Sequence, residues 1–233
     1  MSLRRSLSPG WGLLAGCAAW LAVCAATMRC RRNCSSDAGS TMTHLDKQEF
    51  LAWAYNDLLT NTTRGVLAEY IVAKALGILD TKRVEWDSVD LRVDGIGVEV
   101  KSAAYVQSWG TQPSTISFDI APKMGWDAST GTYPASAERS ADVYVFCLLE
   151  GKDRENVDPL DVEQWTFYVL STSVLNRKRP TQRTIRLEPL KALHPCKCTY
   201  HELKAAIWNA SPRASAETPG ESSTRSDSAT GQS

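Results

Sequence analysis

The alternation of apolar and polar residues from Val89 to Lys101 predicts a β-hairpin, because two alternating runs flank the dipeptide Asp94-Gly95. This dipeptide between such runs is a strong signal for a two-residue turn. The turn fixes the register, so that residues at equal distances from it face each other. One face of the hairpin is then expected to be apolar and to pack on the core. It consists of Val89, Leu91, Val93, Ile96, Val98 and Val100.

The opposite face of this hairpin carries charge. In the predicted register Asp90 lies directly across from Glu99, and Lys101 follows on the same side. Opposed side chains in such a ladder have Cβ atoms roughly 4.5–5.5 Å apart, and like charges at that separation are destabilising. A cation that bridges both carboxylates would reverse the sign of the interaction, an arrangement typical of divalent-metal hydrolases. Asp87 is expected on the apolar side, which favours Asp90 as the functional aspartate.

Two helices are expected before the hairpin, over residues 46–59 and 64–76. The first begins with an aspartate and a glutamate at capping-box-like spacing. The second follows a polar cap at residues 61–63 and ends at Gly77. Glu69 lies within an apolar stripe of this second helix, where a carboxylate is costly unless it is paired or bound to something.

Three further strands and a closing helix are expected after the hairpin. The strands are predicted over residues 115–120, 141–149 and 165–170, and the helix over residues 200–208. The segment 141–149 is apolar on both faces, as is typical of a central strand. This order of elements predicts an α/β fold with a mixed β-sheet flanked by helices.

The composition is that of a globular protein with two atypical ends. The chain has 233 residues, of which 43% are hydrophobic and 22% charged, which suits one domain over residues 42–209. Residues 210–233 lack large apolar side chains and are expected to form a disordered tail. Residues 1–41 form an apolar head flanked by arginines.

The head permits three interpretations. Its apolar segment, residues 11–27, is at the lower limit of length for spanning a bilayer. It could be a signal anchor, a secretory signal with a lipoprotein-like motif ending at Cys17, or untranslated sequence before a true start at Met42. The helix signals that begin just after Met42 favour the third interpretation and a cytoplasmic protein. Membrane attachment is expected only if residues 11–27 are translated and retained.

Charge and cysteine usage limit the partners. The formal net charge is zero, so contact with nucleic acid requires a local basic patch. The best candidate is Arg177-Lys178-Arg179, although a solvated basic loop has the same composition. The seven cysteines do not form a disulfide framework, which fits a reducing compartment. Residues 194–201 contain four potential zinc ligands, but at a spacing too tight for the usual finger pattern.

These residues resemble a known motif. Asp90, eight intervening residues and Glu99-Val100-Lys101 are similar to the PD-(D/E)xK motif of restriction-endonuclease-like nucleases, and the preceding helix with Glu69 resembles their additional acidic helix. The resemblance covers roughly residues 63–109. It departs from the motif at Val89, where a proline would stand. It implies a restriction-endonuclease-like fold and a metal-dependent phosphodiesterase that cleaves DNA, most readily an endonuclease.

The resemblance also implies roles for individual residues. The expected ligands of Mg²⁺ or Mn²⁺ are Asp90, Glu99, the carbonyl of Val100 and Glu69. Lys101 would position the attacking water and stabilise negative charge, so it joins the three acids as a catalytic candidate. Ser102 and Gln107 follow the motif and are candidate contacts to nucleic acid, although Gln107 could also be a plain surface glutamine. The basic patch Arg177, Lys178 and Arg179 supplies the other expected contacts. Many such nucleases are dimers, so a homodimer is a further expectation.

Two alternatives remain open at this point. The fold could serve a non-catalytic nucleic-acid-binding or interaction module with a vestigial site. The chain could also be a membrane-attached or exported protein in which the acidic cluster is a network of salt bridges. The sequence does not distinguish DNA from RNA, or duplex from single strand.

Overall fold

The computed structural model describes residues 44–212 except 82, 86 and 129. The chain divides into two units between Phe50 and Leu51. Helix α2 (Lys47–Ala54) crosses this boundary, and its first turn is capped by Asp46, which accepts a hydrogen bond from the Glu49 amide at 2.7 Å. The helix ends five residues before the predicted position, because the Asp57 side chain accepts a hydrogen bond from the Leu59 amide and favours a turn.

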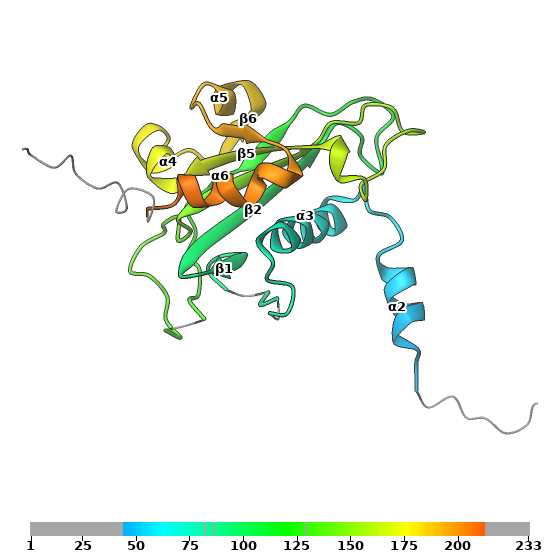
Figure 1. The fold of residues 1–233 in the computed structure, drawn as a ribbon, viewed down its shortest axis with the longest axis horizontal. Coiled ribbons are helices and arrows are strands. Elements are labelled where there is room, and N and C mark those ends of the chain that lie inside the picture. Colours follow the sequence, from blue (N-terminus) through cyan, green and yellow to red (C-terminus); the bar gives the residue numbers. More distant parts are fainter. Residues whose placement is uncertain (1–43, 82, 86, 129, 213–233) are drawn as a thin grey trace, which may run out of the picture. The chain divides into compact units, whose positions relative to one another are not determined.

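The second unit is built on a mixed sheet of five strands in the order β1-β2-β4-β5-β7 (Figure 1). β2 and β4 are parallel, and the other neighbours are antiparallel. The strands are β1 (Leu91–Val93), β2 (Ile96–Ala104), β4 (Val143–Leu149), β5 (Trp165–Ser171) and β7 (Cys196–Cys198). β4 is central and all its residues are buried, as its apolar sequence predicted.

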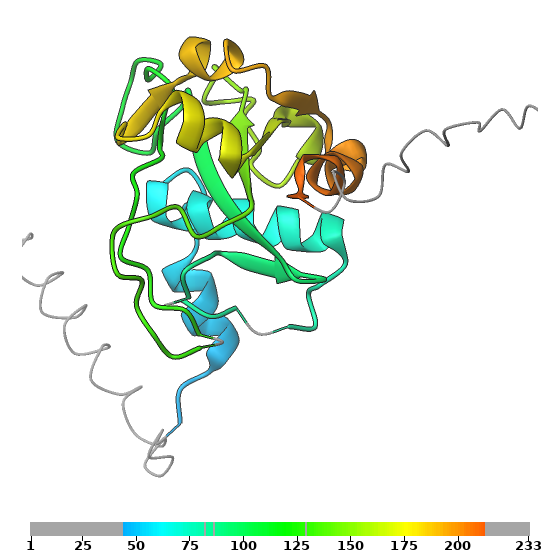
Figure 2. The same ribbon diagram turned by 90° about the vertical axis from the view of Figure 1, so that its left-hand side faces the viewer.

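Each face of the sheet is covered by different elements. One face packs against α3 (Asn61–Leu76) and α6 (Leu203–Ala210). The other packs against α4 (Thr172–Lys178), α5 (Leu187–Lys191) and a ribbon of β3 (Ser117–Asp119) with β6 (Thr184–Arg186). In Figure 2, β2 crosses α3, and the helices α4 and α5 lie above them. The predicted α/β fold, a mixed sheet flanked by helices, is confirmed.

Two short 3-10 helices complete the elements, at Val162–Gln164 and Tyr200–Glu202. The second of these precedes α6, so the predicted closing helix has two parts. None of the helices in the described part of the chain is long and apolar enough to cross a membrane. The apolar segment at residues 11–27 lies outside the described residues.

The predicted hairpin register is confirmed for the residues next to the turn. Val93 pairs with Ile96 and Leu91 with Val98. The two turn residues have φ values of 48° at Asp94 and 76° at Gly95. A type I′ turn requires positive φ at both positions, which an Asp-Gly dipeptide tolerates well.

The hairpin ladder stops at Leu91, so two expectations about its outer end are wrong. Asp90 and Glu99 are not ladder partners. Val89 packs in the core cluster of the opposite sheet face, with Phe118 and Tyr144, instead of joining the apolar face. The physical reason is that the chain leaves the plane of the sheet before Leu91, which ends the alternation on which the prediction depended.

Helix α3 agrees with the predicted helix except at its start. Its N-cap is Thr60, whose hydroxyl accepts a hydrogen bond from the Thr63 amide, and not the segment 61–63. Its C-cap is Gly77, as predicted, in the left-handed conformation with φ of 80°.

Candidate active site

Three predicted site residues come together at the edge of β2. Glu99 and Lys101 alternate with core residues of β2 and lie on the sheet face opposite α3. The Lys101 ammonium donates to Glu99 Oε1 at 2.5 Å and lies 3.9 Å from Asp90 Oδ2. The Glu99 and Lys101 side chains are only 10% and 17% exposed. A single lysine thus bridges two carboxylates in a largely buried setting.

Asp90 is fixed by its own hydrogen bond to the neighbouring strand. Its Oδ2 accepts from the backbone amide of Val100 at 2.7 Å. In a longer hairpin a backbone carbonyl of the first strand would accept this bond, so the Asp90 side chain takes the place of one backbone group. Asp90 is therefore held near Glu99 by a side-chain contact and not by ladder pairing.

The surroundings of Asp90 disfavour its negative charge. Burial raises the pKa of Asp90 to about 6, and the charge of Glu99 acts in the same direction, against the opposing effect of Lys101. Burial by itself would lower the pKa of Lys101, but the charges of Glu99 and Asp90 outweigh it, so this pKa is raised. Lys101 therefore stays protonated near neutral pH, and its single charge leaves the repulsion between the carboxylates only partly relieved.

Glu69 lies near this group, but Arg83 engages its carboxylate. Arg83 donates to the two carboxylate oxygens at 2.5 Å and 3.2 Å, and no hydrogen bond or ion pair among the described residues joins Glu69 to Lys101. Glu69, Arg83 and Asp90 line a common pocket of about 430 Å³ between α3 and the hairpin. The charge of Glu69 also contributes to raising the pKa of Asp90.

The described residues contain no group of three or more His, Cys, Asp or Glu side chains already arranged to hold a metal ion. Near β2, lysine and arginine side chains contact the carboxylates, with Lys101 and Lys123 at Glu99 and Arg83 at Glu69. Of the four predicted ligands, Asp90 and Glu99 share contact with Lys101, and Val100 bonds to Asp90 through its amide. Glu69 pairs with Arg83 instead.

Two residues that sequence reasoning missed complete the charged group. The Lys123 ammonium lies 3.5 Å from Glu99 Oε1 and 3.6 Å from Asp119 Oδ2. Asp119 ends β3, and Lys123 follows in a loop that bridges to Glu138. No local motif links Lys123 to Glu99, which lies 24 positions earlier in the chain, so only the packing of the ribbon on the sheet brings them together.

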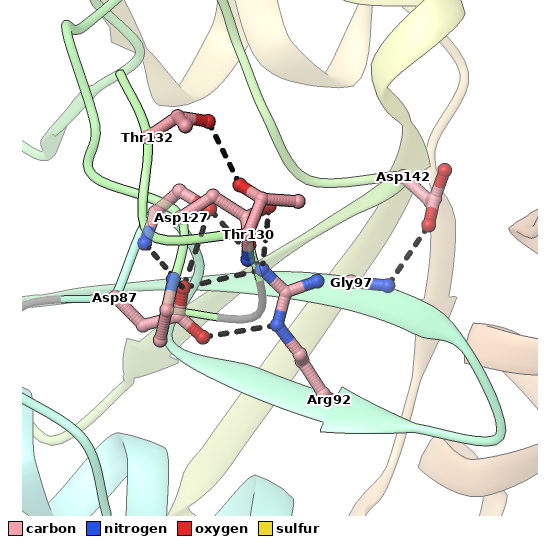
Figure 3. A network of polar contacts seen from close by, with 9 residues as sticks. Asp87, Arg92, Gly97, Asp127, Thr130, Thr132 and Asp142 are labelled. Atoms are coloured by element: carbon pink, nitrogen blue, oxygen red, sulfur yellow. Dashed lines mark hydrogen bonds and ion pairs between the residues drawn. The ribbon is translucent and has the colours of Figure 1, made fainter. Parts of the chain in front are cut away.

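Asp87 belongs to a separate structural network beside this site (Figure 3). Its carboxylate pairs with Arg92 at 2.9 Å and accepts from the Ala128 amide at 3.1 Å. Arg92 also lies 3.3 Å from Asp127, so the network ties the loop after β3 to the hairpin. The Arg92 hydrogen bonds lower the pKa of Asp87 to about 2. The expectation that Asp87 faces the apolar side is wrong, because its chain segment lies outside the ladder.

Figure 3 also shows how the start of β4 is held against the hairpin. The Asp142 carboxylate accepts from the Gly97 amide at 2.8 Å, and the Asp142 amide donates to the Gly97 carbonyl at 2.8 Å. These two bonds extend the pairing between β2 and β4 next to the strand that carries Glu99.

Ser102 and Gln107 are not part of the charged group. Strand alternation places Ser102 on the sheet face opposite Lys101. Gln107 is buried and engaged at both ends of its amide, since it accepts from Arg64 at 3.1 Å and donates to the Ala104 carbonyl at 2.9 Å. The structure thus gives Gln107 a packing role between α3 and the end of β2.

The basic segment at the end of α4 lies on the same sheet face as Glu99 and Lys101. Arg177 and Lys178 are exposed and Arg179 is half-buried. The buried Arg139 holds the chain just after α4, because its guanidinium donates to the carbonyls of Arg179 and Gln182 at 2.8 Å and 3.1 Å.

A comparison with protein families finds a match for this chain. Residues 27–188, more than half of the chain, match the family model described as bacteriophage T4 endonuclease IV. The matched range contains Glu69, Asp90, Glu99 and Lys101. No curated protein matches the chain.

Proposed function

Because the chain belongs to the bacteriophage T4 endonuclease IV family, we propose that it is a metal-dependent DNA endonuclease with a PD-(D/E)xK-type site on a restriction-endonuclease-like fold. The observation that carries this proposal is the meeting of Asp90, Glu99 and Lys101 at the edge of β2. Two carboxylates and a lysine lie within contact distance on β2 and just before β1, after the helix that carries Glu69. These are groups that metal-dependent phosphodiester hydrolysis uses.

The donor set fits Mg²⁺ or Mn²⁺, which prefer hard oxygen ligands. Asp90 and Glu99 would supply carboxylate oxygens, and the pKa of Asp90, raised by burial and by the charge of Glu99, is consistent with a cation bound beside it. The Val100 amide bonds to Asp90, and in a β-ladder the amide and carbonyl of one residue point toward the same neighbouring strand. The Val100 carbonyl therefore faces the Asp90 side, as a third ligand would.

When bound, the ion would lower the pKa of a coordinated water and neutralise charge on the phosphate. The raised pKa of Lys101 favours a cationic role over proton abstraction. Lys101 would donate to a phosphate oxygen and stabilise the negative charge that develops there. Asp90 would keep its hydrogen bond to the Val100 amide, which would hold the carboxylate in place beside β2.

We assign Glu69 a supporting role. Its bidentate pairing with Arg83 fits a position one water molecule away from the ion better than direct ligation. In the same proposal Arg177, Lys178 and Arg179 contact the DNA backbone, because α4 lies on the sheet face that carries Glu99 and Lys101 and lysine and arginine bind phosphate.

The test is a cleavage assay on the full chain with plasmid, linear and single-stranded DNA in Mg²⁺, Mn²⁺ or EDTA. We expect cleavage with either ion and none in EDTA. Glu99→Gln and Lys101→Gln should lose activity at least about 100-fold. The matched control Glu188→Gln removes an exposed carboxylate on α5 and should remain active.

Metal binding separates this proposal from a vestigial site. Calorimetry should detect Mg²⁺ binding to the wild type that Glu99→Gln weakens. If the protein binds DNA but neither binds Mg²⁺ nor cleaves, the non-catalytic interpretation is correct instead.

A further inference from the structure

We propose that Lys123 is a phosphate-binding residue of this site, a second cation that contacts the DNA backbone beside Lys101. This inference rests on the proposed function. The observation behind it is that Lys101 and Lys123, from different segments, approach the same oxygen, Glu99 Oε1, at 2.5 Å and 3.5 Å. The two ammonium groups are held unequally by this oxygen, and the one that is held less tightly is available for another anion.

The contact lengths indicate which lysine is available. Charge-assisted hydrogen bonds from nitrogen to a carboxylate are typically about 2.7–2.9 Å long. Lys123 lies beyond this length from both Glu99 and Asp119, and its side chain is 53% exposed, against 17% for Lys101. Exposed ion pairs of this kind contribute little to stability. Exchange of these carboxylates for a phosphate would therefore cost little.

The backbone of Lys123 is nevertheless well positioned. Its amide donates to the Glu138 carbonyl at 2.8 Å, and the Glu138 amide donates back at 3.0 Å. The loop is also tied to the hairpin through Asp87 and Arg92. The fixed main chain thus keeps Lys123 at the site, and its loosely held ammonium can move to contact a bound anion.

The charge of the group points to a phosphodiester as that anion. Asp90, Glu99 and Asp119 face two ammonium groups, so the group carries one net negative charge when all five are ionised. A divalent ion at Asp90 and Glu99 would change this to one net positive charge, which complements a phosphodiester. Without Lys123 the loaded site would be neutral and would lack this attraction.

The experiment compares Lys123→Gln and Lys123→Arg with the control Lys204→Gln, which removes an exposed charge from α6 on the opposite sheet face. Affinity for a fluorescein-labelled DNA oligonucleotide is measured in Ca²⁺, a divalent ion that also takes oxygen ligands, over a range of salt concentrations. Steady-state cleavage is measured in Mg²⁺. Thermal unfolding of each variant shows that it is folded.

For Lys123→Gln we expect KM to rise about tenfold with kcat changed less than about threefold, because the lost contact binds the phosphate before reaction. The slope of log K against log salt should become shallower by about 0.7–0.9, which corresponds to one phosphate contact. Lys123→Arg should recover most of both effects, and Lys204→Gln should resemble the wild type.

The two proposals fail in different ways. If the wild type cleaves and Lys123→Gln matches it in KM and salt slope, or Lys204→Gln shows the same shifts, the role of Lys123 is refuted alone. If the wild type does not cleave in Mg²⁺ or Mn²⁺, the proposed function fails, while the salt slope in Ca²⁺ still decides whether Lys123 contacts DNA.

Discussion

The carboxylate of Asp90 accepts a hydrogen bond from the backbone amide of Val100 at 2.7 Å. A side chain thereby replaces a backbone carbonyl at the point where the hairpin ladder ends. The same bond holds a carboxylate of raised pKa beside Glu99 and Lys101. Asp90 thus has a structural contact and a proposed chemical role, and two substitutions separate them.

Asp90→Asn keeps an oxygen that can accept the Val100 hydrogen bond but removes the charge, whereas Asp90→Ala removes both. We expect both variants to lose cleavage at least about 100-fold, since neither can help to hold the ion. At pH 4, where Asp90 is protonated, only Asp90→Ala should be destabilised, by about 1–2 kcal/mol, because it leaves the Val100 amide without its partner. Urea unfolding and cleavage rates measure the two effects. Equal cleavage by Asp90→Asn and the wild type would refute the catalytic assignment.

The raised pKa of Asp90 predicts a pH-dependent stability in the absence of metal. Its pKa is about 6 in the folded protein and 3.8 for an ordinary aspartate, so the folded state binds the proton more tightly than the unfolded state. Its stabilising contribution is complete below pH 3.8 and is lost as the pH rises through 6. The loss should be on the order of 2–3 kcal/mol.

The measurement is the free energy of unfolding from pH 4 to pH 7 in EDTA, for the wild type and Asp90→Asn. The difference between the two proteins isolates this carboxyl group from the other titrations. A difference that stays constant with pH would contradict the prediction. Saturating Mg²⁺ should reduce the loss, because the ion binds the ionised form.

The pairing of Glu69 with Arg83 predicts an effect on metal affinity. Arg83→Gln releases a carboxylate into the pocket that Asp90 also lines, and the added negative charge should tighten Mg²⁺ binding a few-fold. Calorimetry on the variant measures this. In a Glu69→Gln background the same Arg83→Gln substitution should have no such effect, and an effect of equal size there would show that Glu69 is not involved.

The network of Asp87 and Arg92 predicts acid sensitivity of the opposite sign. The pKa of Asp87 is lowered to about 2 from 3.8, so its contribution is present above pH 3.8 and is lost as the pH falls through 2. Because the Asp87 side chain is only 9% exposed, this contribution should be on the order of 2 kcal/mol. The free energy of unfolding from pH 5 to pH 2 should depend less on pH in Asp87→Asn than in the wild type. The same pH dependence in both proteins would show that the pair is unimportant.

Local patterns predicted the parts of the fold that local physics determines. The Asp94-Gly95 turn set the hairpin register because only residues that tolerate positive φ fit it, and Gly77 ended α3 for the same reason. The apolar sequence of β4 identified the central strand. Alternation along β2 correctly placed Glu99 and Lys101 on one face, where the structure brings them together.

What the sequence did not predict depends on contacts between distant segments. Lys123 reaches Glu99 only because the β3–β6 ribbon packs on the sheet, and Arg83 reaches Glu69 across a loop after α3. The displacement of Val89 follows from a change in chain direction that leaves no trace in the pattern of apolar residues. The elements β6, β7, α4 and α5 are three to seven residues long, too short for periodicity to identify them.

The outermost strands of the sheet, β1 and β7, are each three residues long. A short edge strand offers few free amides and carbonyls to a strand of another molecule. Beyond the end of β1, the next free amide on β2 is that of Val100, and it already donates to the Asp90 carboxylate. Two copies of this protein therefore expose little strand edge through which their sheets could pair. If two copies act together, we expect helix and loop surfaces to join them.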